Sequence, residues 1–308
     1  MDNFIFKNKA GAKINCYKWI NNSQKPKAII QIAHGMSELA ERYDYFAKKL
    51  VDEGYIVYAH DHDGHGHSVE STDKLGFING ENKFYSMLED IKQFNDIIRN
   101  ENKELSLILF GHSMGSFLSQ RYIQMYGDSI DALILSGSNG KPKLFTKAGL
   151  IVSKLQILFN GENKRSTLMD KLSFGGFNKS VKNSRTNFDW LCSNDSEVDK
   201  YIEDDYCGFI YPSHFYYDLI NGLWDIHKVE NMERVKELNI PIYIFSGDRD
   251  PVGYFGEGVK NLYEGYKKIG VKDLTYKMYK DGRHEMLNEN NKDEVISDII
   301  KWLEEHNK

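Results

Sequence analysis

The sequence predicts an α/β fold in which a mostly parallel central sheet carries helices on both faces and a helical cap insertion. Short apolar runs alternate with segments of helical spacing along most of the 308 residues, as expected of parallel strands joined by crossover helices. A content of 41% hydrophobic and 13% aromatic residues is sufficient for a large core. One long interval, from about residue 140 to residue 211, lacks any strand pattern.

The first predicted element is a β-hairpin, with Phe4, Ile5 and Phe6 before a turn at residues 10–12 and a second strand at residues 14–19. Apolar runs then predict buried strands at residues 28–33, 55–59, 105–110, 132–135, 242–245 and 274–278. Helical spacing between these runs predicts helices at residues 43–52, 83–100, 114–126, 259–269 and 294–306.

The interval without strands is expected to form a helical cap, because a structureless loop of that length is rare in a compact domain. Residues 1–139 and 212–308 are therefore assigned to the core, and residues 140–211 to the cap. Residues 147–159 are strongly apolar at helical spacing, and Leu150, Leu155 and Leu158 are the expected substrate-binding residues. Part of this helix is expected to face a substrate channel or to make transient contact with a membrane surface. The alternative is that both faces pack inside the cap.

A nucleophile elbow is predicted at Gly111-His112-Ser113-Met114-Gly115, which lies between a predicted strand and a predicted helix. The turn is so tight that bulky residues two positions on either side of the serine collide, which explains the two glycines. It presents the hydroxyl near the positive end of the following helix. A chance match is expected roughly 0.1 times in a chain of this length and composition, so Ser113 is the candidate nucleophile.

A serine hydroxyl becomes a good nucleophile when a neighbouring base accepts its proton. Among the ten histidines, His284 is the candidate base, because it lies in the loop between the last predicted strand and the last predicted helix. A buried carboxylate must hold its ring in one tautomer. We favour Asp250, whose spacing from the preceding strand carries it towards the histidine loop, and expect Asp248 to be a turn residue that bonds its own backbone.

Acyl transfer also requires hydrogen-bond donors for the developing oxyanion. One candidate is the backbone N–H of Met114, immediately after the nucleophile. The other is the backbone N–H of Met36, in the loop His34-Gly35-Met36 that follows the strand at residues 28–33.

Histidines and aspartates that could suggest a zinc or nickel site gather in the segment His60-Asp61-His62-Asp63-Gly64-His65-Gly66-His67-Ser68. Their spacing matches no closed four-ligand site, and the glycines indicate a turn after a strand. We therefore expect no functional metal in this segment.

The net charge of −5, with basic residues spread along the chain, leaves no basic stripe for nucleic acid. Residues 1–10 lack the apolar centre of a secretory signal, and no apolar run reaches the roughly 18 residues of a membrane span. The three cysteines are an odd number without CxxC spacing, so a cytoplasmic location is expected. The sequence leaves the oligomeric state open.

Taken together, these residues resemble the monoacylglycerol lipase and lysophospholipase branch of the α/β-hydrolases, the serine aminopeptidase S33-like domain. The resemblance spans nearly the whole chain. It rests on the elbow and on His34-Gly35-Met36 with Glu38, Arg42 and Tyr43, Asp61 with Gly64-His65-Gly66 and Ser68, Asp250-Pro251-Val252, and Gly282 to Glu285. In the cap, Asp189-Trp190-Leu191 and residues 205–209 resemble bacterial members. Asp63 stands where the family usually has arginine, which puts that loop's usual salt bridges in doubt.

The resemblance implies the α/β-hydrolase fold and hydrolysis of a small-molecule lipid ester with one acyl chain, a monoacylglycerol or a lysophospholipid. The reaction would pass through an acyl-enzyme on Ser113 without a cofactor. A short-chain carboxylesterase or an S33-type aminopeptidase on the same triad is the alternative, and Glu203, Asp204 and Asp205 are the acidic residues that could bind a free amino terminus. A catalytically inactive binding protein is disfavoured because no triad residue is missing.

Overall fold

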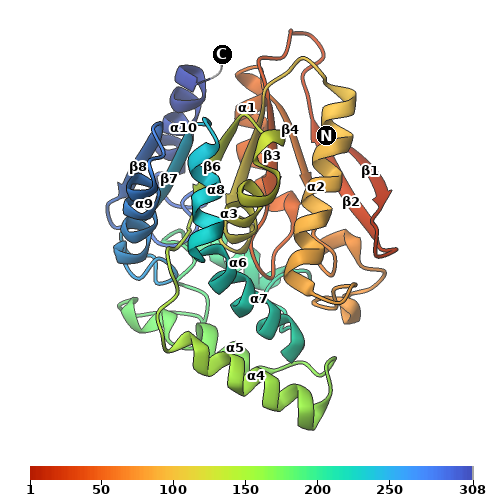
Figure 1. Ribbon diagram of the computed structural model, residues 1–308, viewed down its shortest axis with the longest axis vertical. Coiled ribbons are helices and arrows are strands. Elements are labelled where there is room, and N and C mark those ends of the chain that lie inside the picture. The colour runs from red at the N-terminus through yellow and green to blue at the C-terminus, as the bar shows by residue number, and fades with distance from the viewer. Residues whose placement is uncertain (307–308) are drawn as a thin grey trace.

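An eight-stranded sheet forms the centre of the computed structural model, which describes residues 1–306 (Figure 1). The strand order is β1-β2-β4-β3-β5-β6-β7-β8; the β1–β2 and β2–β4 pairs are antiparallel and all other pairs are parallel. The strands are β1 (Asp2–Lys7), β2 (Lys13–Trp19), β3 (Ile29–Ala33), β4 (Ile56–His60), β5 (Leu107–His112), β6 (Ala132–Ser136), β7 (Ile242–Gly247) and β8 (Leu274–Tyr279). The predicted hairpin and mostly parallel sheet are confirmed, although β8 is a half-buried edge strand rather than a buried one.

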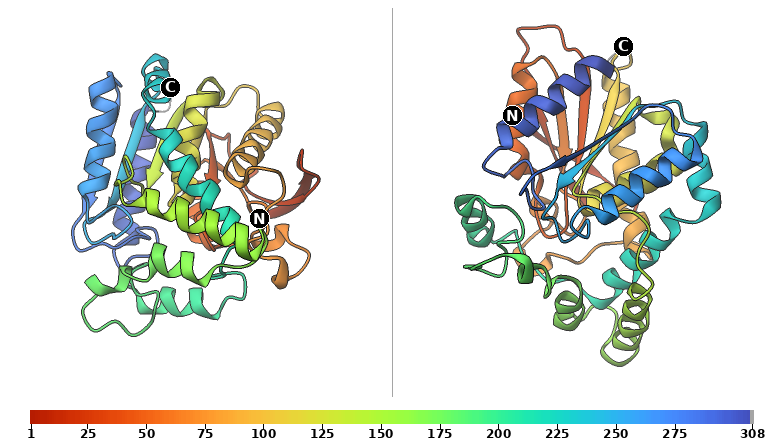
Figure 2. Two further views of the ribbon diagram at one scale, coloured as in Figure 1. Left: turned by 60° about the horizontal axis from the view of Figure 1, so that its bottom comes forward. Right: turned by 90° about the vertical axis from the view of Figure 1, so that its left-hand side faces the viewer.

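Helices cover both faces of the sheet, as predicted (Figures 1 and 2). On one face lie α1 (Asp44–Asp52) and α10 (Lys292–His306), and on the other lie α2 (Lys83–Glu101), α3 (Met114–Tyr126) and α9 (Glu257–Ile269). Two further helices on the second face, α7 (Ser213–Ile226) and α8 (Val229–Glu237), were not predicted. Aromatic residues, Asn221 and Gly222 give α7 a low intrinsic helix propensity, so its helical pattern is weak in the sequence.

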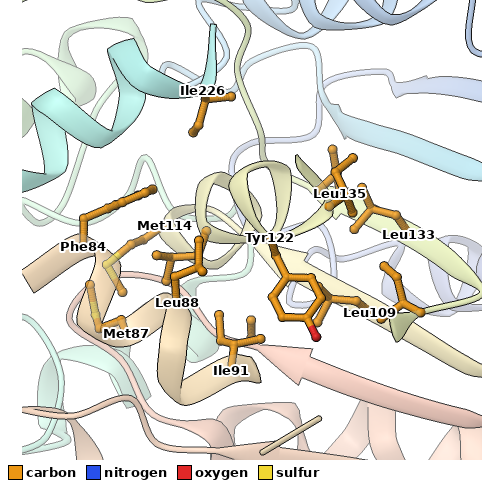
Figure 3. Close-up of a cluster of buried hydrophobic side chains, with 14 of the residues drawn as sticks. Phe84, Met87, Leu88, Ile91, Leu109, Met114, Tyr122, Leu133, Leu135 and Ile226 are labelled. Carbon is orange, nitrogen blue, oxygen red and sulfur yellow. The ribbon is translucent and has the colours of Figure 1, made fainter. Parts of the chain in front are cut away.

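The central strands carry apolar side chains on both faces of the sheet. Each of them therefore appears in the sequence as a continuous apolar run. Along β5, Leu107 and Leu109 point into one apolar cluster, whereas Ile108 and Phe110 point into the other. Figure 3 shows the first cluster, in which side chains of α2 and α3 meet those of β5 and β6. Burial on both faces fixes the register of the strands and therefore the positions of the loops that follow them.

Between β6 and β7 the chain forms the predicted helical insertion. It contains α4 (Thr146–Asn160), α5 (Thr167–Phe174) and α6 (Asp195–Glu203), and no strand within residues 140–211 apart from one isolated bridge between Arg165 and Pro212. The predicted helix at residues 147–159 corresponds to α4. This helix packs along α7 at the end of the molecule away from the C-terminus (Figures 1 and 2).

Among residues 1–306, no helix has both the length and the apolar character that a membrane span requires. The three cysteines, Cys16, Cys192 and Cys207, are free thiols.

The start of α3 lies directly on the end of β3. A side chain on Gly115 would place its Cβ 2.1 Å from the carbonyl oxygen of Ala33 and 2.5 Å from that of His34. A side chain on Gly111 would lie 2.5 Å from the carbonyl oxygen of Gly115. Backbone atoms cannot move aside as a flexible side chain can, so both glycines are required by close packing, as predicted for the elbow.

We predict that Gly115→Ala lowers the free energy of unfolding by about 1–3 kcal/mol or more, because the new methyl group overpacks a backbone contact. Gly265→Ala is the matched control. Gly265 also lies in a helix, but its Cβ would meet nothing closer than 3.8 Å. This control should stabilise the protein by about 0.5–1 kcal/mol through helix propensity alone. Urea unfolding of both variants tests the prediction, and equal effects of the two substitutions would contradict it.

Candidate active site

Ser113 occupies a strained turn between β5 and α3. Its φ of 52° lies in the left-handed region, which is unfavourable for a residue with a Cβ. The backbone N–H of Ser113 donates to the carbonyl of Ser136 in β6, at 3.0 Å, and its own carbonyl accepts from Ser116 and Phe117 of α3. These bonds hold the serine at the carboxyl edge of the sheet, and strain of this kind is characteristic of functional positions.

Asp250 and His284, which lie 34 positions apart, are in contact. The Nδ1 of His284 lies 3.0 Å from each carboxylate oxygen of Asp250. Asp250 is fully buried and also accepts hydrogen bonds from Ser246 Oγ and the Val252 N–H, each at 2.8 Å. Because a carboxylate only accepts, Nδ1 carries the proton, and Nε2 of neutral His284 is left as an acceptor.

The carboxylates around His284 stabilise its protonated form relative to that of a free imidazole. Burial lowers the pKa of His284, but the carboxylates of Asp250, Glu285 and Glu38 outweigh it and raise the pKa above its ordinary value. Burial likewise raises the pKa of Asp250, and the His284 ring together with hydrogen bonds to the carboxylate outweighs that effect and lowers it. A base whose protonated form is stabilised by a buried carboxylate is suited to accept a proton from a hydroxyl.

Asp248, the other aspartate considered, does not bond its own turn. Its carboxylate accepts the backbone N–H of Asp281 at 2.7 Å, and its side chain is 41% exposed. This corrects the expectation of a local turn contact: the loops after β7 and β8 lie side by side, so the nearest unpaired N–H belongs to the neighbouring loop. The structure thus brings Asp250, not Asp248, to His284.

Ser113 and His284 line one cavity of about 680 Å³ between the sheet and the cap. The loop at residues 35–38 lines it as well, which places Met36 beside Ser113. No loop hydrogen bond of the described residues uses the Met36 N–H, and Met114 begins α3, where backbone N–H groups lack helical partners. Met36 therefore lines this cavity with an amide available to a ligand, and Met114, which follows Ser113 in the chain, is the other candidate donor.

The cavity wall is largely apolar and comes from the cap. The ring of Trp190 lies 5.2 Å, centroid to centroid, from that of His284. Other apolar and aromatic side chains that line the cavity are Phe174, Phe188, Leu191, Phe209 and Ile210.

The cap leucines proposed from the sequence do not line this cavity, which corrects that prediction. Leu150, Leu155 and Leu158 belong to α4, whose buried side packs on α7. Leu155 and Leu158 are exposed to solvent, and Leu150 is partly buried. The segments that wall the cavity instead are α5, residues 187–191 and residues 208–210. The apolar pattern identified a helix correctly, but it could not reveal that this helix packs on α7 and does not line the cavity.

Arg42 connects the two loops that flank Ser113. Its Nη1 donates to Glu38 at 2.6 Å, and its two Nη atoms bond both oxygens of Glu285, at 2.7 and 2.6 Å. Glu38 in turn accepts the N–H of Gly35 at 2.5 Å. Burial raises the pKa of Glu285, but Arg42 outweighs it and lowers that pKa to about 2. The i,i+4 spacing of Glu38 and Arg42 and the position of Glu285 next to His284 were the sequence signals of this network.

In the histidine-rich segment at the end of β4, His60, His62 and His65 are buried, whereas His67 is exposed. Among the described residues, no group of three or more His, Cys, Asp or Glu side chains could hold a metal ion. Burial holds the pKa of His60 and His62 well below the ordinary value, with neighbouring histidines adding to the effect. Asp63 accepts hydrogen bonds from the N–H and the Nδ2 of Asn79, and so anchors the next loop in place of an arginine salt bridge.

The sequence matches the family described as serine aminopeptidase, S33, over residues 24–291. A monoacylglycerol lipase of Mycolicibacterium smegmatis is 25% identical over 284 residues, which cover 91% of this chain and 89% of that protein. The monoglyceride lipase of Rattus norvegicus is 27% identical over 310 residues, which cover 96% of this chain and 88% of the rat protein. Among solved structures, a thermostable carboxyl esterase from Bacillus coagulans is 27% identical and superposes with a TM-score of 0.92, covering 100% of this chain and 99% of the esterase.

These likenesses extend over both the sheet and the helical insertion, and they confirm the resemblance that the motifs indicated. The chain has the α/β-hydrolase fold and belongs to the serine aminopeptidase S33 family.

Proposed function

We propose that this protein is a serine hydrolase that cleaves esters carrying one fatty acyl chain, such as monoacylglycerols or lysophospholipids. The observation that carries the proposal is the bond from His284 to the buried carboxylate of Asp250, at the same largely apolar cavity that the strained Ser113 lines. The names of the relatives, two monoglyceride-type lipases and a carboxyl esterase, support the same class of substrate.

The reaction follows from the tautomer of His284. Ser113 Oγ attacks the ester carbonyl carbon while its proton passes to Nε2 of His284, and Asp250 stabilises the imidazolium. The carbonyl oxygen becomes an oxyanion that accepts the N–H groups of Met36 and Met114. Collapse breaks the ester C–O bond, and His284 returns the proton to the leaving alcohol. Water, deprotonated by His284, then attacks the acyl-enzyme and releases the fatty acid and Ser113.

The lining of the cavity favours an acyl chain over a free amino terminus. Of the carboxylates that line the cavity, Glu38 and Glu285 are both bonded to Arg42, which leaves Asp170 as the remaining carboxylate. Asp204 lies elsewhere, beside Glu197 and Lys200. An aminopeptidase requires a negatively charged pocket for the substrate ammonium group. Asp170 shares the cavity with Lys171 and Lys179, whose positive charges oppose such a group, so this function is the weaker candidate. A short-chain carboxylesterase remains the second candidate, favoured by the overall likeness to the carboxyl esterase.

The decisive experiment measures kcat/KM for p-nitrophenyl esters of increasing chain length, below their micelle concentrations. Each methylene buried in the cavity adds about 0.8 kcal/mol, so kcat/KM should rise with length and favour chains around C8–C16 over acetate and butyrate. Monoacylglycerol should be cleaved, and an aminoacyl amide should not. Ser113→Ala should abolish both turnover and fluorophosphonate labelling. A flat or falling profile would favour the short-chain esterase.

The acid is tested by comparing two aspartates two positions apart. Asp250→Asn should lower kcat by about 10⁴, because an amide favours the wrong tautomer of His284. Asp248→Asn removes a carboxylate of the same type that bonds Asp281 rather than His284, and kcat should change little. Steady-state kinetics on one ester test this prediction. A larger loss of kcat in Asp248→Asn than in Asp250→Asn would show that Asp248, and not Asp250, is the acid.

We further propose that the outer cap meets an anionic lipid surface, from which a single-chain substrate would be drawn. Ile151, Leu155, Leu158 and Phe159 recur at helical spacing on the exposed side of α4; Leu158 is 75% and Phe159 79% exposed. Residues 141–185 contain ten basic and two acidic residues, a net charge of +8 within a chain of net charge −5. Apolar side chains flanked by lysines are typical of helices that lie in the interface of anionic membranes.

Co-sedimentation with vesicles tests this docking surface. The protein should bind vesicles of phosphatidylglycerol and phosphatidylcholine more strongly than pure phosphatidylcholine vesicles, and high salt should reduce binding. Replacing both Leu158 and Phe159 by serine should weaken vesicle binding while hydrolysis of a soluble ester stays at the wild-type rate. Ile5→Ser, at an exposed apolar residue of β1, is the control. Equal binding of the wild type to both vesicle types would contradict the proposal. Weaker vesicle binding in Ile5→Ser but not in the Leu158 and Phe159 variant would contradict it as well.

A further inference from the structure

The loop that carries Met36 is held from the cap side by hydrogen bonds to Ser37. The Ser37 N–H donates to the Tyr211 hydroxyl at 2.8 Å. The Ser37 carbonyl accepts from the Tyr201 hydroxyl at 3.0 Å and from the N–H of Gly208 at 2.9 Å. The Ser37 hydroxyl donates to the carbonyl of Phe209 at 2.9 Å. All three polar groups of one loop residue are therefore bonded to residues 201–211.

Ser37 needs such support because its backbone is not in a relaxed conformation. Its φ of 56° lies in the left-handed region, which residues with a Cβ seldom adopt. Met36, whose N–H is the proposed oxyanion donor, is its immediate neighbour. The bond from the Ser37 N–H fixes the peptide that follows Met36, so the bonds to Ser37 restrain the part of the loop that carries this donor.

The Tyr211 hydroxyl is itself oriented by a buried histidine. The Nδ1 of His65 lies 3.0 Å from the carbonyl oxygen of Asp63, which only accepts, so Nδ1 carries the proton. The Nε2 of His65 then accepts the hydroxyl proton of Tyr211, at 2.5 Å. The resulting chain runs from Ser37 N–H to Tyr211 O–H to His65. It requires a neutral His65, in agreement with burial, which lowers the pKa of His65 to about 4.

A second pair of neutral histidines holds the other end of the same loop. His34 donates from Nδ1 to the Gly35 carbonyl at 2.8 Å, and its Nε2 accepts the N–H of His62 at 3.0 Å. His62 donates from Nε2 to the His34 carbonyl at 3.2 Å. Of the histidines that suggested a metal site, His62 thus bonds the backbone of the oxyanion loop directly and His65 bonds it through Tyr211.

We propose that Tyr211, the last residue of the cap, is a positioning residue of the catalytic machinery that holds the oxyanion loop through Ser37 and is oriented by His65. This inference rests on the proposed function, because it assigns a purpose to the direction of the Met36 amide. The cap is then part of the site that stabilises the transition state and is more than a wall around the substrate.

Tyr211→Phe removes one oxygen atom and leaves the Ser37 N–H and His65 Nε2 without partners. The loss of a whole oxyanion donor lowers kcat about 10²- to 10³-fold, so a misdirected donor should lower it about 10- to 100-fold. KM should stay within about twofold, because the amide acts mainly in the transition state. His65→Phe should cause a similar loss, and combining the two should add little, because both break one chain.

A transition-state analogue separates positioning from simple destabilisation. An alkyl trifluoromethyl ketone forms a tetrahedral adduct in which Ser113 Oγ bonds the carbonyl carbon, His284 takes the serine proton and the ketone oxygen becomes the oxyanion. Its affinity should fall in Tyr211→Phe by the same factor as kcat/KM. If Tyr211→Phe only destabilised the protein, fewer molecules would be active but each would turn over normally. A wild-type kcat per active site, with the sites counted by fluorophosphonate titration, would therefore overturn the inference.

The matched control is Tyr216→Phe, which removes the hydroxyl of a tyrosine whose ring contacts that of Tyr211. The Tyr216 hydroxyl lies 3.5 Å from Asp170 Oδ1 and is not bonded to the oxyanion loop. It should leave kcat and analogue affinity unchanged. Should Tyr211→Phe fail to fold, Tyr201→Phe, which removes the bond to the Ser37 carbonyl, should lower kcat about threefold or more with KM unchanged. A folded variant with wild-type kcat and analogue affinity overturns the inference. Absence of fluorophosphonate labelling in the wild type would instead reject the proposed function itself.

Discussion

The buried guanidinium of Arg42 is the interaction on which the geometry of the candidate site depends. A buried charge without partners is strongly unfavourable, so Arg42 is stable in this position only while it keeps its bonds to Glu38 and Glu285. Glu38 belongs to the oxyanion loop, and Glu285 is the neighbour of His284. In the proposed mechanism, the ion pairs of Arg42 therefore link the loop of the oxyanion donor Met36 to the general base, while Ser113 is held by the sheet.

The cap divides into an inner and an outer part with different physical roles. Its inner segments are bonded to both loops of the site: the Glu285 N–H donates to the Leu191 carbonyl, and Ser37 is bonded to residues 201–211. The outer helix α4 reaches the core through α7 and keeps an apolar side exposed. The two parts of the cap are therefore attached to different elements of the core.

The sequence was sufficient for features that depend on local pattern. Alternating strands and helices, and the elbow around Ser113, follow from burial periodicity and from glycines that a tight turn requires. Asp250 could be separated from Asp248 because spacing after a strand fixes which side chain reaches His284. The contacts of Tyr211 could not be predicted, since it meets His65 across 146 positions and no local pattern encodes such a pair. The prediction that the α4 leucines bind substrate was wrong for a related reason. An apolar helix face predicts burial or binding, but it does not show which surface or ligand the helix contacts.

Burial lowers the pKa of the histidines around the site, and the neighbouring charges decide whether the net shift is downward or upward. Burial lowers the pKa of His34 well below the ordinary value, and that of His65 to about 4, because no carboxylate outweighs it there. The same burial acts on His284, but Asp250, Glu285 and Glu38 reverse it. In the proposed mechanism, His284 therefore takes the proton released by Ser113, while His34 and His65 stay neutral. They must stay neutral, because a protonated His34 or His65 loses the acceptor nitrogen through which it holds the oxyanion loop.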